Sequence, residues 1–275
     1  TRATPLSSTI DYRVPGNGSN LPIHAEIGKL RYLADNTEPC ILNAMSNLAT
    51  GAANPSDHHK KGVRQVARYL QTNHSGTTYD GKEILLFAEV DANYVTKHDS
   101  KSQIGYALFL NLHSGTIHAR SRKDTKVSRS STEPEIRAIG HVITEIVWAR
   151  GFLTDITFPP PGPTTVCTDS YSSIIMGETQ KVNDNSKHIT HDVNYINQHI
   201  RDGTIILKPV DTEDNCADIM TKNLPPGPFT KHSRTLQQGH GGRPIIGKPR
   251  KSRHHAGKAV NRTTSSQRQR VAHGN

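Results

Sequence analysis

Residues 84–91 read Ile-Leu-Leu-Phe-Ala-Glu-Val-Asp, and they mark the point at which the sequence changes from helical to extended patterns. The segment from Ile84 to Val90 has the composition of a strand, and a second such run follows from Ile104 to Leu110. A short third segment, Thr116 to Ala119, comes after the turn-forming residues 113–115. We therefore predict three strands that are joined by hairpin connections.

Helices and strands alternate after these hairpins. An apolar stripe at helical spacing predicts a helix from about Thr132 to Leu153. The run Thr164 to Thr168 is apolar enough to be a central strand, and it leads directly into Asp169. The remaining predicted elements are a helix with the stripe Ile189, Val193, Ile196 and Ile200, a strand from Thr204 to Val210, and a helix from Glu213 to Lys222. This order predicts an α/β fold with a mixed five-stranded sheet covered by helices.

The chain before residue 82 has a different pattern. Residues 1–21 are polar and rich in turn formers, and they are predicted to be a linker. Three apolar stripes at helical spacing then lie within residues 22–75, and Pro55-Ser-Asp57 supplies start signals for the third helix. We expect these helices to pack as a separate small bundle without a site of its own.

Positive charge is concentrated at the end of the chain. Of the 34 Lys and Arg residues, 11 lie between residues 231 and 275, a stretch without Asp or Glu, which leaves 23 basic against 24 acidic residues before it. Because apolar residues are almost absent there, residues 232–275 are predicted to be a disordered basic tail. Such a tail attracts nucleic-acid phosphates through counterion release, although a merely solvated end is the alternative. The candidate binding residues are Arg243, Lys248, Arg250, Lys251 and Arg253.

The cysteines and the hydropathy narrow the class of protein. Cys40, Cys167 and Cys216 are an odd number without paired spacing, so the sequence indicates neither a disulfide framework nor a cysteine-based zinc site. A reducing intracellular compartment fits best. All apolar runs are far shorter than the roughly 20 residues of a spanning helix, so no membrane partner is expected. The N-terminus lacks the pattern of a signal peptide and looks like a cut from something longer.

Four acidic residues lie at corresponding places in the predicted elements. Asp91 ends the first strand, Glu135 opens the long helix, Asp169 follows the central strand, and Asp218 lies in the last helix. In sheets of this kind, sites gather where loops leave the strand ends. Each acid also has a structural interpretation as a turn residue, a helix cap or a solvated side chain. The joint order of the four acids therefore carries the functional hypothesis.

Short motifs in a fixed order connect residues 84–223 with a known family. The stretches are Ala88-Glu-Val-Asp-Ala-Asn-Tyr94, Ser130-Ser-Thr-Glu-Pro-Glu135, Cys167-Thr-Asp-Ser170, Ser186-Lys-His-Ile189 and Ala217-Asp-Ile-Met-Thr-Lys222. Together they resemble the ribonuclease H domain of copia-type retrotransposon polyproteins. Residues 22–70 extend the resemblance, because they look like the end of the reverse transcriptase that joins the polymerase to this domain.

The resemblance implies a ribonuclease H-like fold over residues 82–224 and an activity. Members of the family cut the RNA strand of RNA–DNA hybrids during reverse transcription, with two divalent ions that are normally Mg²⁺, Mn²⁺ being an alternative. By this resemblance Asp91 bridges both ions, Glu135 and Asp169 complete one, and Asp218 completes the other. Hard cations prefer oxygen ligands, and two of them stabilise both the attacking and the leaving oxygen.

The resemblance also implies the surroundings of the chain. Its partners would be the RNA–DNA hybrid and the rest of the polyprotein, including the polymerase domain. Its location would be the cytoplasm, inside a virus-like particle, with the nucleus as the alternative. No Tyr-x-Asp-Asp stretch occurs, so the polymerase site lies outside this sequence.

Alternatives to this interpretation remain open on the sequence. Glu133 competes with Glu135 for the second acidic position, although the family motif places the catalytic acid second. A catalytically inactive relic that only binds nucleic acid would share the fold, and departures such as Ser170, where Asn is common, fit it. An integrase-like nuclease with three carboxylates is opposed by the fourth acid in the last helix. His188 and His191 have a spacing that can hold zinc, but no matching pair accompanies them, and His188 belongs to the family motif.

Overall fold

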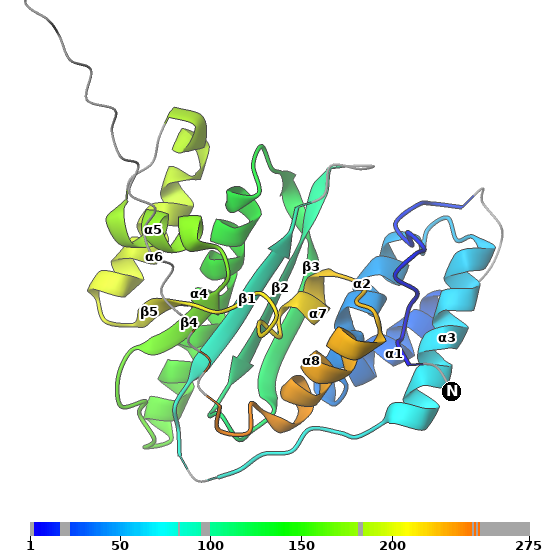
Figure 1. Ribbon diagram of the computed structural model, residues 1–275, viewed down its shortest axis with the longest axis horizontal. Helices are drawn as coiled ribbons and strands as arrows, with labels where there is room; N and C mark the ends of the chain where they lie inside the picture. The colour runs from blue at the N-terminus through cyan, green and yellow to red at the C-terminus, as the bar shows by residue number, and fades with distance from the viewer. Residues whose placement is uncertain are drawn as a thin grey trace, which may run out of the picture.

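The predicted order of hairpins, helix, strand, helix and strand is found in the computed structural model of the chain (Figure 1). The structure describes residues 3–16, 23–81, 83–94, 100–180, 184–243, 245 and 247. Its five strands are β1 (Phe87–Asn93), β2 (Lys101–Phe109), β3 (Thr116–Val127), β4 (Thr164–Thr168) and β5 (Ile205–Pro209). Within the described residues, no helix is long and apolar enough to cross a membrane.

The strands form one mixed sheet in the order β3-β2-β1-β4-β5. β1 pairs antiparallel with β2, and β2 pairs antiparallel with β3, whereas β4 runs parallel to both β1 and β5. This arrangement confirms the ribonuclease H-like mixed sheet of five strands. β3 is much longer than the predicted segment, because an edge strand needs few apolar residues and its polar continuation to Val127 carries a weak strand signal.

One face of the sheet is covered by three helices and a 3₁₀ segment. These are α4 (Thr132–Asp155), α5 (Tyr171–Thr179), α6 (Thr190–Arg201) and η2 (Asp184–Ile189). Alternate strand residues such as Val90 and Ile104 are fully buried against Ile139 and Ile143 of α4. The helices predicted at the positions of α4 and α6 are therefore confirmed, because their apolar stripes are the faces that meet the sheet.

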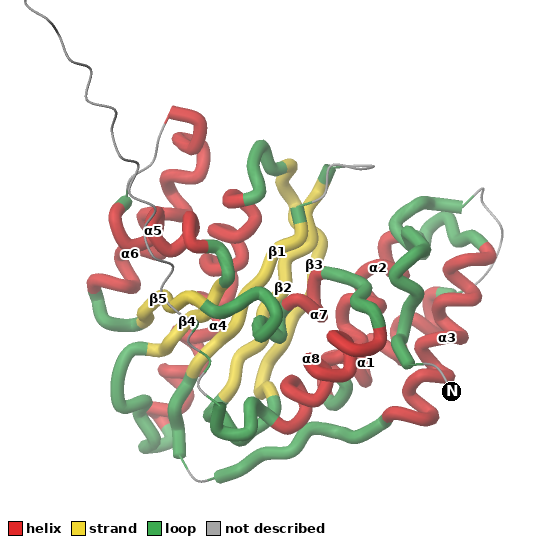
Figure 2. Tube along the Cα trace, in the orientation of Figure 1, coloured by secondary structure: helices red, strands yellow, loops and turns green. Residues whose placement is uncertain are grey.

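The opposite face is covered by helices from both ends of the chain (Figure 2). They are α1 (His24–Asn36), η1 (Pro39–Ile41), α2 (Leu42–Thr50), α3 (Asp57–Asn73), α7 (Asp218–Thr221) and α8 (Pro226–Gln238). Met45 and Val66 of the upstream helices share one buried core with Phe109 and Phe229. The prediction of a separate small bundle is wrong in this respect, because the apolar stripes of these helices complete the core of the sheet.

The N-terminal segment is also part of this core. Leu6 and Tyr12 are buried, and the carbonyl oxygen of Tyr12 lies 2.8 Å from Nε2 of His59 in α3. The other ring nitrogen of His59 forms a capping box with Ser56, which starts α3 where the sequence predicted. The prediction of a linker over residues 1–21 is therefore wrong for the packed residues, and residues 1, 2 and 17–21 lie outside the described residues.

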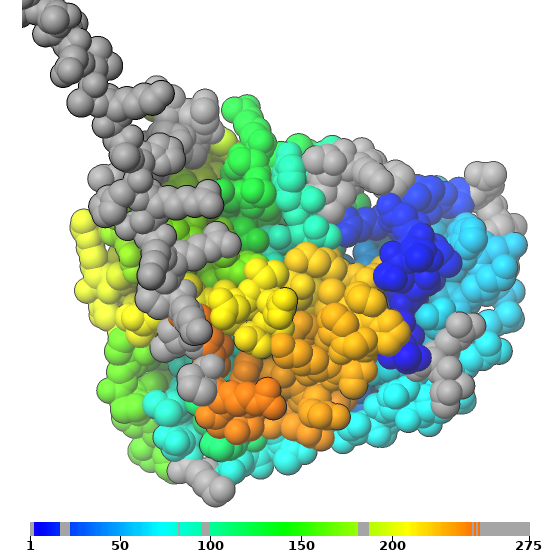
Figure 3. All heavy atoms as spheres, viewed as in Figure 1, coloured from blue at the N-terminus to red at the C-terminus, as the bar shows by residue number. Residues whose placement is uncertain are grey.

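The C-terminal elements differ most from the prediction. The expected helix from Glu213 to Lys222 is reduced to the single turn of α7. The ribonuclease H-like domain was predicted to end at residue 224, yet α8 follows it, and Pro226 occupies the first turn of this helix, where a missing N–H costs nothing. Residues 232–238 are thus helical and not a disordered tail. In the space-filling view the yellow-to-orange segment through α8 covers the middle of this face (Figure 3).

Candidate active site

Asp91 lies near the carboxyl end of β1, in the centre of the sheet, and its side chain is almost fully buried. Its Oδ2 accepts a short hydrogen bond from the hydroxyl of Thr221 in α7. The close approach of α7 depends on Gly105, which faces Asp91 across the β1–β2 ladder. A Cβ at Gly105 would lie 2.4 Å from Cβ of Met220, so a larger residue there would push α7 away from Asp91.

Glu135 and Asp169 lie close to Asp91 at the edge of the sheet where β1 and β4 have their carboxyl ends. Asp169 directly follows β4, and because β1 and β4 are parallel their carboxyl ends lie side by side. Glu135 is in the first turn of α4, and its Oε1 accepts a hydrogen bond from the backbone N–H of Ala92 at 3.3 Å. One carboxylate oxygen from each of the three acids lies within 4.8 Å of the others. The structure therefore brings these three predicted site residues together.

The electrostatics of this cluster favour a bound cation. Burial raises the pKa of Asp91 to about 7, with further increases from Asp218 and Asp169, while Lys222 and Thr221 lower it. Burial, followed by Asp91 and Asp169, raises the pKa of Glu135 well above its usual range. Oε2 of Glu135 is buried without a hydrogen-bond partner. Close carboxylates that resist ionisation are the arrangement that a divalent ion relieves, and carboxylate oxygens are its preferred ligands.

Asp218 lies beside this cluster but is separated from Asp91 by a positive charge. Nζ of Lys222 is 2.5 Å from Oδ1 of Asp218 and 3.6 Å from Oδ2 of Asp91. Although burial lowers the pKa of Lys222, the carboxylates of Asp91, Asp218 and Asp169 raise it overall. The ammonium group therefore interacts with three of the four predicted acids. Asp218 is the first residue of α7, and its carboxylate is paired with Lys222.

The structure separates Glu135 from its competitor Glu133. Oε1 of Glu133 lies 3.0 Å from Nε2 of His188, and its Oε2 lies 3.8 Å from Arg137. Arg137 is in turn paired with Asp124 at 2.6 Å. Glu133 thus belongs to a separate buried ion-pair network, which also gives His188 of the family motif a partner.

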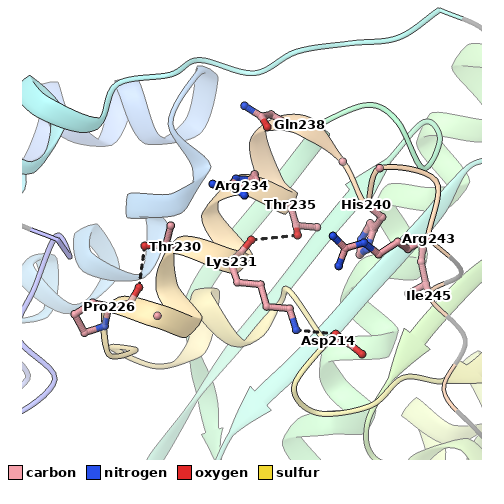
Figure 4. Close-up of a pocket in the computed structure, with 13 residues that line it drawn as sticks. Asp214, Pro226, Thr230, Lys231, Arg234, Thr235, Gln238, His240, Arg243 and Ile245 are labelled. Atoms are coloured by element: carbon pink, nitrogen blue, oxygen red, sulfur yellow. Dashed lines mark hydrogen bonds and ion pairs between the residues drawn. The ribbon is translucent and has the colours of Figure 1, made fainter.

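Lys222 and Thr221 are the contacts that the sequence interpretation missed. Lys222 follows Asp218 by four residues, and this spacing is a recognisable signal for an ion pair on a helix. The contact between Thr221 and Asp91 joins residues that are 130 positions apart, and nothing local indicates it. Of the predicted nucleic-acid-binding residues, Arg243 lines a surface cavity beside α8 (Figure 4). Lys248, Arg250, Lys251 and Arg253 lie outside the described residues.

The chain is similar in sequence to known Pol polyproteins. No family model matches the chain. It is 29% identical over 241 residues to the retrovirus-related Pol polyprotein from transposon RE2 of Arabidopsis thaliana, covering 85% of this chain and 16% of that protein. It is 30% identical over 201 residues to the corresponding protein from transposon RE1 of the same plant, covering 72% of this chain and 14% of that protein.

The chain therefore spans about one sixth of the length of these relatives. Among solved structures, LC11-RNase H1, which was isolated from compost by a metagenomic approach, matches with a TM-score of 0.40 and 14% identity. That match covers 50% of this chain and 91% of the other.

Proposed function

Because the chain belongs to the Pol polyproteins of copia-type retrotransposons, we propose that it is the ribonuclease H part of such a polyprotein, preceded by the end of the reverse transcriptase. In this proposal it hydrolyses the RNA strand of RNA–DNA hybrids during reverse transcription. Its partners are the hybrid and the polymerase domain of the same polyprotein. Its location is the cytoplasm, within a virus-like particle, or the nucleus.

The observation that carries this proposal is the meeting of Asp91, Glu135 and Asp169 at one edge of the sheet, with Asp218 beside them. Three carboxylates in a largely buried site are costly unless cations compensate them. Oε2 of Glu135 is buried without a hydrogen-bond partner, so it is a further potential ligand atom. Oxygen-only ligands select hard ions, which supports Mg²⁺, with Mn²⁺ as a substitute.

In the proposed assignment, Asp91 would contribute to holding both ions, Glu135 and Asp169 would help to hold one, and Asp218 would help to hold the other. When bound, such ions would supply a nucleophilic water and stabilise the departing oxygen of the phosphodiester. The residues around them keep the ligands in place. Thr221 orients the Asp91 carboxylate, and the N–H of Ala92 fixes one oxygen of Glu135.

Lys222 distinguishes the two ion positions. Its ammonium group stands between Asp91 and Asp218, so a second ion at that position must compete with a charge supplied by the chain itself. By contrast, Asp91, Glu135 and Asp169 have oxygens close together. We therefore expect the first ion to bind among these three acids and the second to bind more weakly.

The same observation favours a second candidate function. If Lys222 permanently replaces the second ion, the chain would bind hybrids without cutting them, as an inactive relic. The basic residues from Arg243 onward would then supply most of the affinity, through phosphate contacts that carry no sequence information.

Cleavage of an RNA–DNA hybrid labelled on both strands, in Mg²⁺ and in EDTA, tests the proposal. We expect cleavage of the RNA strand alone, and only with the metal. A parallel binding titration in Ca²⁺ reports affinity without turnover. Hybrid binding without cleavage in Mg²⁺ or Mn²⁺ would overturn the enzyme proposal and support the relic. Cleavage of both strands would contradict the substrate assignment.

A further inference from the structure

A second group of metal-binding side chain types lies on the same face of β1, two residues before Asp91. It consists of Glu89, Cys216 and His240, and one ligand atom from each lies within 4.8 Å of the other two. Glu89 and Cys216 have no exposed surface, and the His240 side chain is 11% exposed. None of the three belongs to the Asp91 cluster, so the proposed hydrolysis does not account for their proximity.

The fold places these three residues from distant parts of the chain. Glu89 is fixed in the central strand, and its Oε2 accepts a hydrogen bond from the backbone N–H of Cys216 at 2.6 Å. His240 follows α8 after Gly239, whose positive φ of 78° and lack of space for a Cβ both require glycine. The imidazole of His240 packs edge-on against Phe87 and Phe109. Its position is therefore held by packing as well as by charge.

The polar atoms at the centre of this group are incompletely satisfied. Oε1 of Glu89 and Nε2 of His240 are 2.9 Å apart, yet both are buried without a hydrogen bond of acceptable geometry. Buried polar atoms in folded proteins normally have such a partner. One potential ligand atom from each of Glu89, Cys216 and His240 lies within 4.8 Å of the other two. This is the second observation, besides residue type, that points to a ligand.

A cavity of about 850 Å³ reaches His240, one member of this group. Figure 4 shows the cavity between α8, which carries Lys231 and Arg234, and the segment with His240 and Arg243. Lys231 is paired with Asp214 at 2.7 Å. His240 lines the cavity, whereas Glu89 and Cys216 do not. A small ion could therefore reach the group from the side of His240.

We propose that Glu89, Cys216 and His240 bind one Zn²⁺ ion, with a water molecule as the fourth ligand. Zinc binds thiolate, imidazole and carboxylate ligands at about 2.0 to 2.3 Å in tetrahedral geometry. In that geometry the ligand atoms lie closer to one another than the 4.8 Å within which those of Glu89, Cys216 and His240 lie. Binding of the ion would require small side-chain rotations, including a slight separation of Glu89 Oε1 and His240 Nε2, which are 2.9 Å apart. One carboxylate and one thiolate balance the charge of the ion, so the buried site becomes neutral. The mixed sulfur, nitrogen and oxygen ligands disfavour Mg²⁺.

Spectroscopy with Co²⁺ in place of Zn²⁺ tests this site in the full chain. Excess Mg²⁺ is present throughout to occupy the Asp91 cluster. We expect one Co²⁺ per chain, a thiolate-to-cobalt charge-transfer band, intense tetrahedral visible bands, and their loss on addition of Zn²⁺. Only coordination by a cysteine sulfur produces the charge-transfer band, so cobalt bound by carboxylates alone would lack it. A weak octahedral spectrum without that band would overturn the proposal.

Matched variants identify the ligands. Cys216→Ser should remove the charge-transfer band, while Cys40→Ser, another buried cysteine that instead contacts Glu38 and Tyr69, should keep it. His240→Asn lies on a peripheral segment and should weaken Zn²⁺ binding by at least about 100-fold, since changes to partners outside the ligand shell already cost about 10- to 100-fold. A band that survives Cys216→Ser, or Zn²⁺ affinity unchanged by His240→Asn, would leave only a structural ion pair. Neither result bears on hybrid cleavage.

Discussion

The two groups of potential ligands on β1 differ in how the chain builds them. Asp91 meets Glu135 and Asp169 where parallel strands end, and the ligands are all carboxylate oxygens. Glu89 meets Cys216 and His240 over the buried middle of the same strand, with sulfur, nitrogen and oxygen ligands. Two residues along one strand thus separate a site suited to a hard ion from one suited to a softer ion. Ligand chemistry and access, more than position in the fold, distinguish the functions that we propose for the two groups.

The largest expected effect is the loss of cleavage when Asp91 is changed to Asn. The substitution keeps the size of the side chain but removes the charge that both proposed ions share. We expect at least an approximately 10²-fold loss in cleavage rate, the scale on which single preorganised electrostatic groups act. Hybrid binding in Ca²⁺ should persist, because phosphate contacts come mainly from basic and backbone groups.

Asp35→Asn is the matched control for this change, because Asp35 is exposed and forms a surface ion pair with Arg31. It should cleave at the rate of the unchanged chain. An Asp91→Asn variant that cleaves normally would show that the edge cluster, which consists of Asp91, Glu135 and Asp169, takes no part in cleavage. The two groups on β1 would then not differ in the proposed way.

The next effect separates the two acids at the start of α4. Glu135→Gln should lower cleavage by at least about 10²-fold, because its carboxylate lies with Asp91 and Asp169. Glu133→Gln should lower it much less, because Glu133 contacts His188 and Arg137 instead. Cleavage rates at saturating hybrid decide between them. Equal losses in the two variants would show that the ion-pair network of Glu133 also sets the geometry of the site.

Much of the edge cluster was predictable from the sequence, whereas the interior group of Glu89, Cys216 and His240 was not. Asp91, Asp169 and Glu135 lie at the ends of strongly patterned elements, so their convergence followed from the topology and from the family motifs. His240 follows α8, a helix that was not predicted because prolines lie at its start. The position of His240 depends on the turn at Gly239. The paired spacing that indicates cysteine-based zinc sites is absent, so Cys216 gave no signal.

The same distinction applies to the fold. Helices and strands with full apolar stripes were located well, because burial against the sheet imposes their period. The length of β3 and the packing of Leu6 and Tyr12 were missed, since each depends on contacts with residues far along the chain. A local pattern cannot report whether a helix stands alone or completes another core.

A smaller effect is the pH dependence of the free energy of unfolding that the raised pKa of Asp91 in the edge cluster causes. Without metal, folded Asp91 holds its proton up to a pKa of about 7, whereas the unfolded chain loses it near the ordinary aspartate pKa of 3.8. Unfolding therefore releases protons between these limits, and the free energy of unfolding falls as pH rises through this window. Mg²⁺ competes with the protons, so its stabilising effect should grow over the same range.

Melting temperatures in EDTA and in Mg²⁺, at about pH 5 and about pH 8, measure this linkage. The increase caused by Mg²⁺ should be clearly larger at the higher pH, and Asp91→Asn should reduce that difference. An increase independent of pH would mean that the ion binds elsewhere.

The smallest effect concerns Lys222, whose ammonium group stands between Asp91 and Asp218. Lys222→Gln should destabilise the metal-free chain by about 1 kcal/mol, a modest value because the side chain is about one third exposed to solvent. The lost charge should be replaced by Mg²⁺, so the variant should recover stability in Mg²⁺ and bind the ion more tightly than the unchanged chain does. Denaturant unfolding with and without Mg²⁺ gives both quantities, and Lys231→Gln, which removes a surface ion pair with Asp214, is the control.

If Mg²⁺ fails to restore the stability of Lys222→Gln, the ammonium does not occupy the place of a second ion. Lys222 would then be a ligand-positioning residue, and the edge cluster would hold a single ion among Asp91, Glu135 and Asp169.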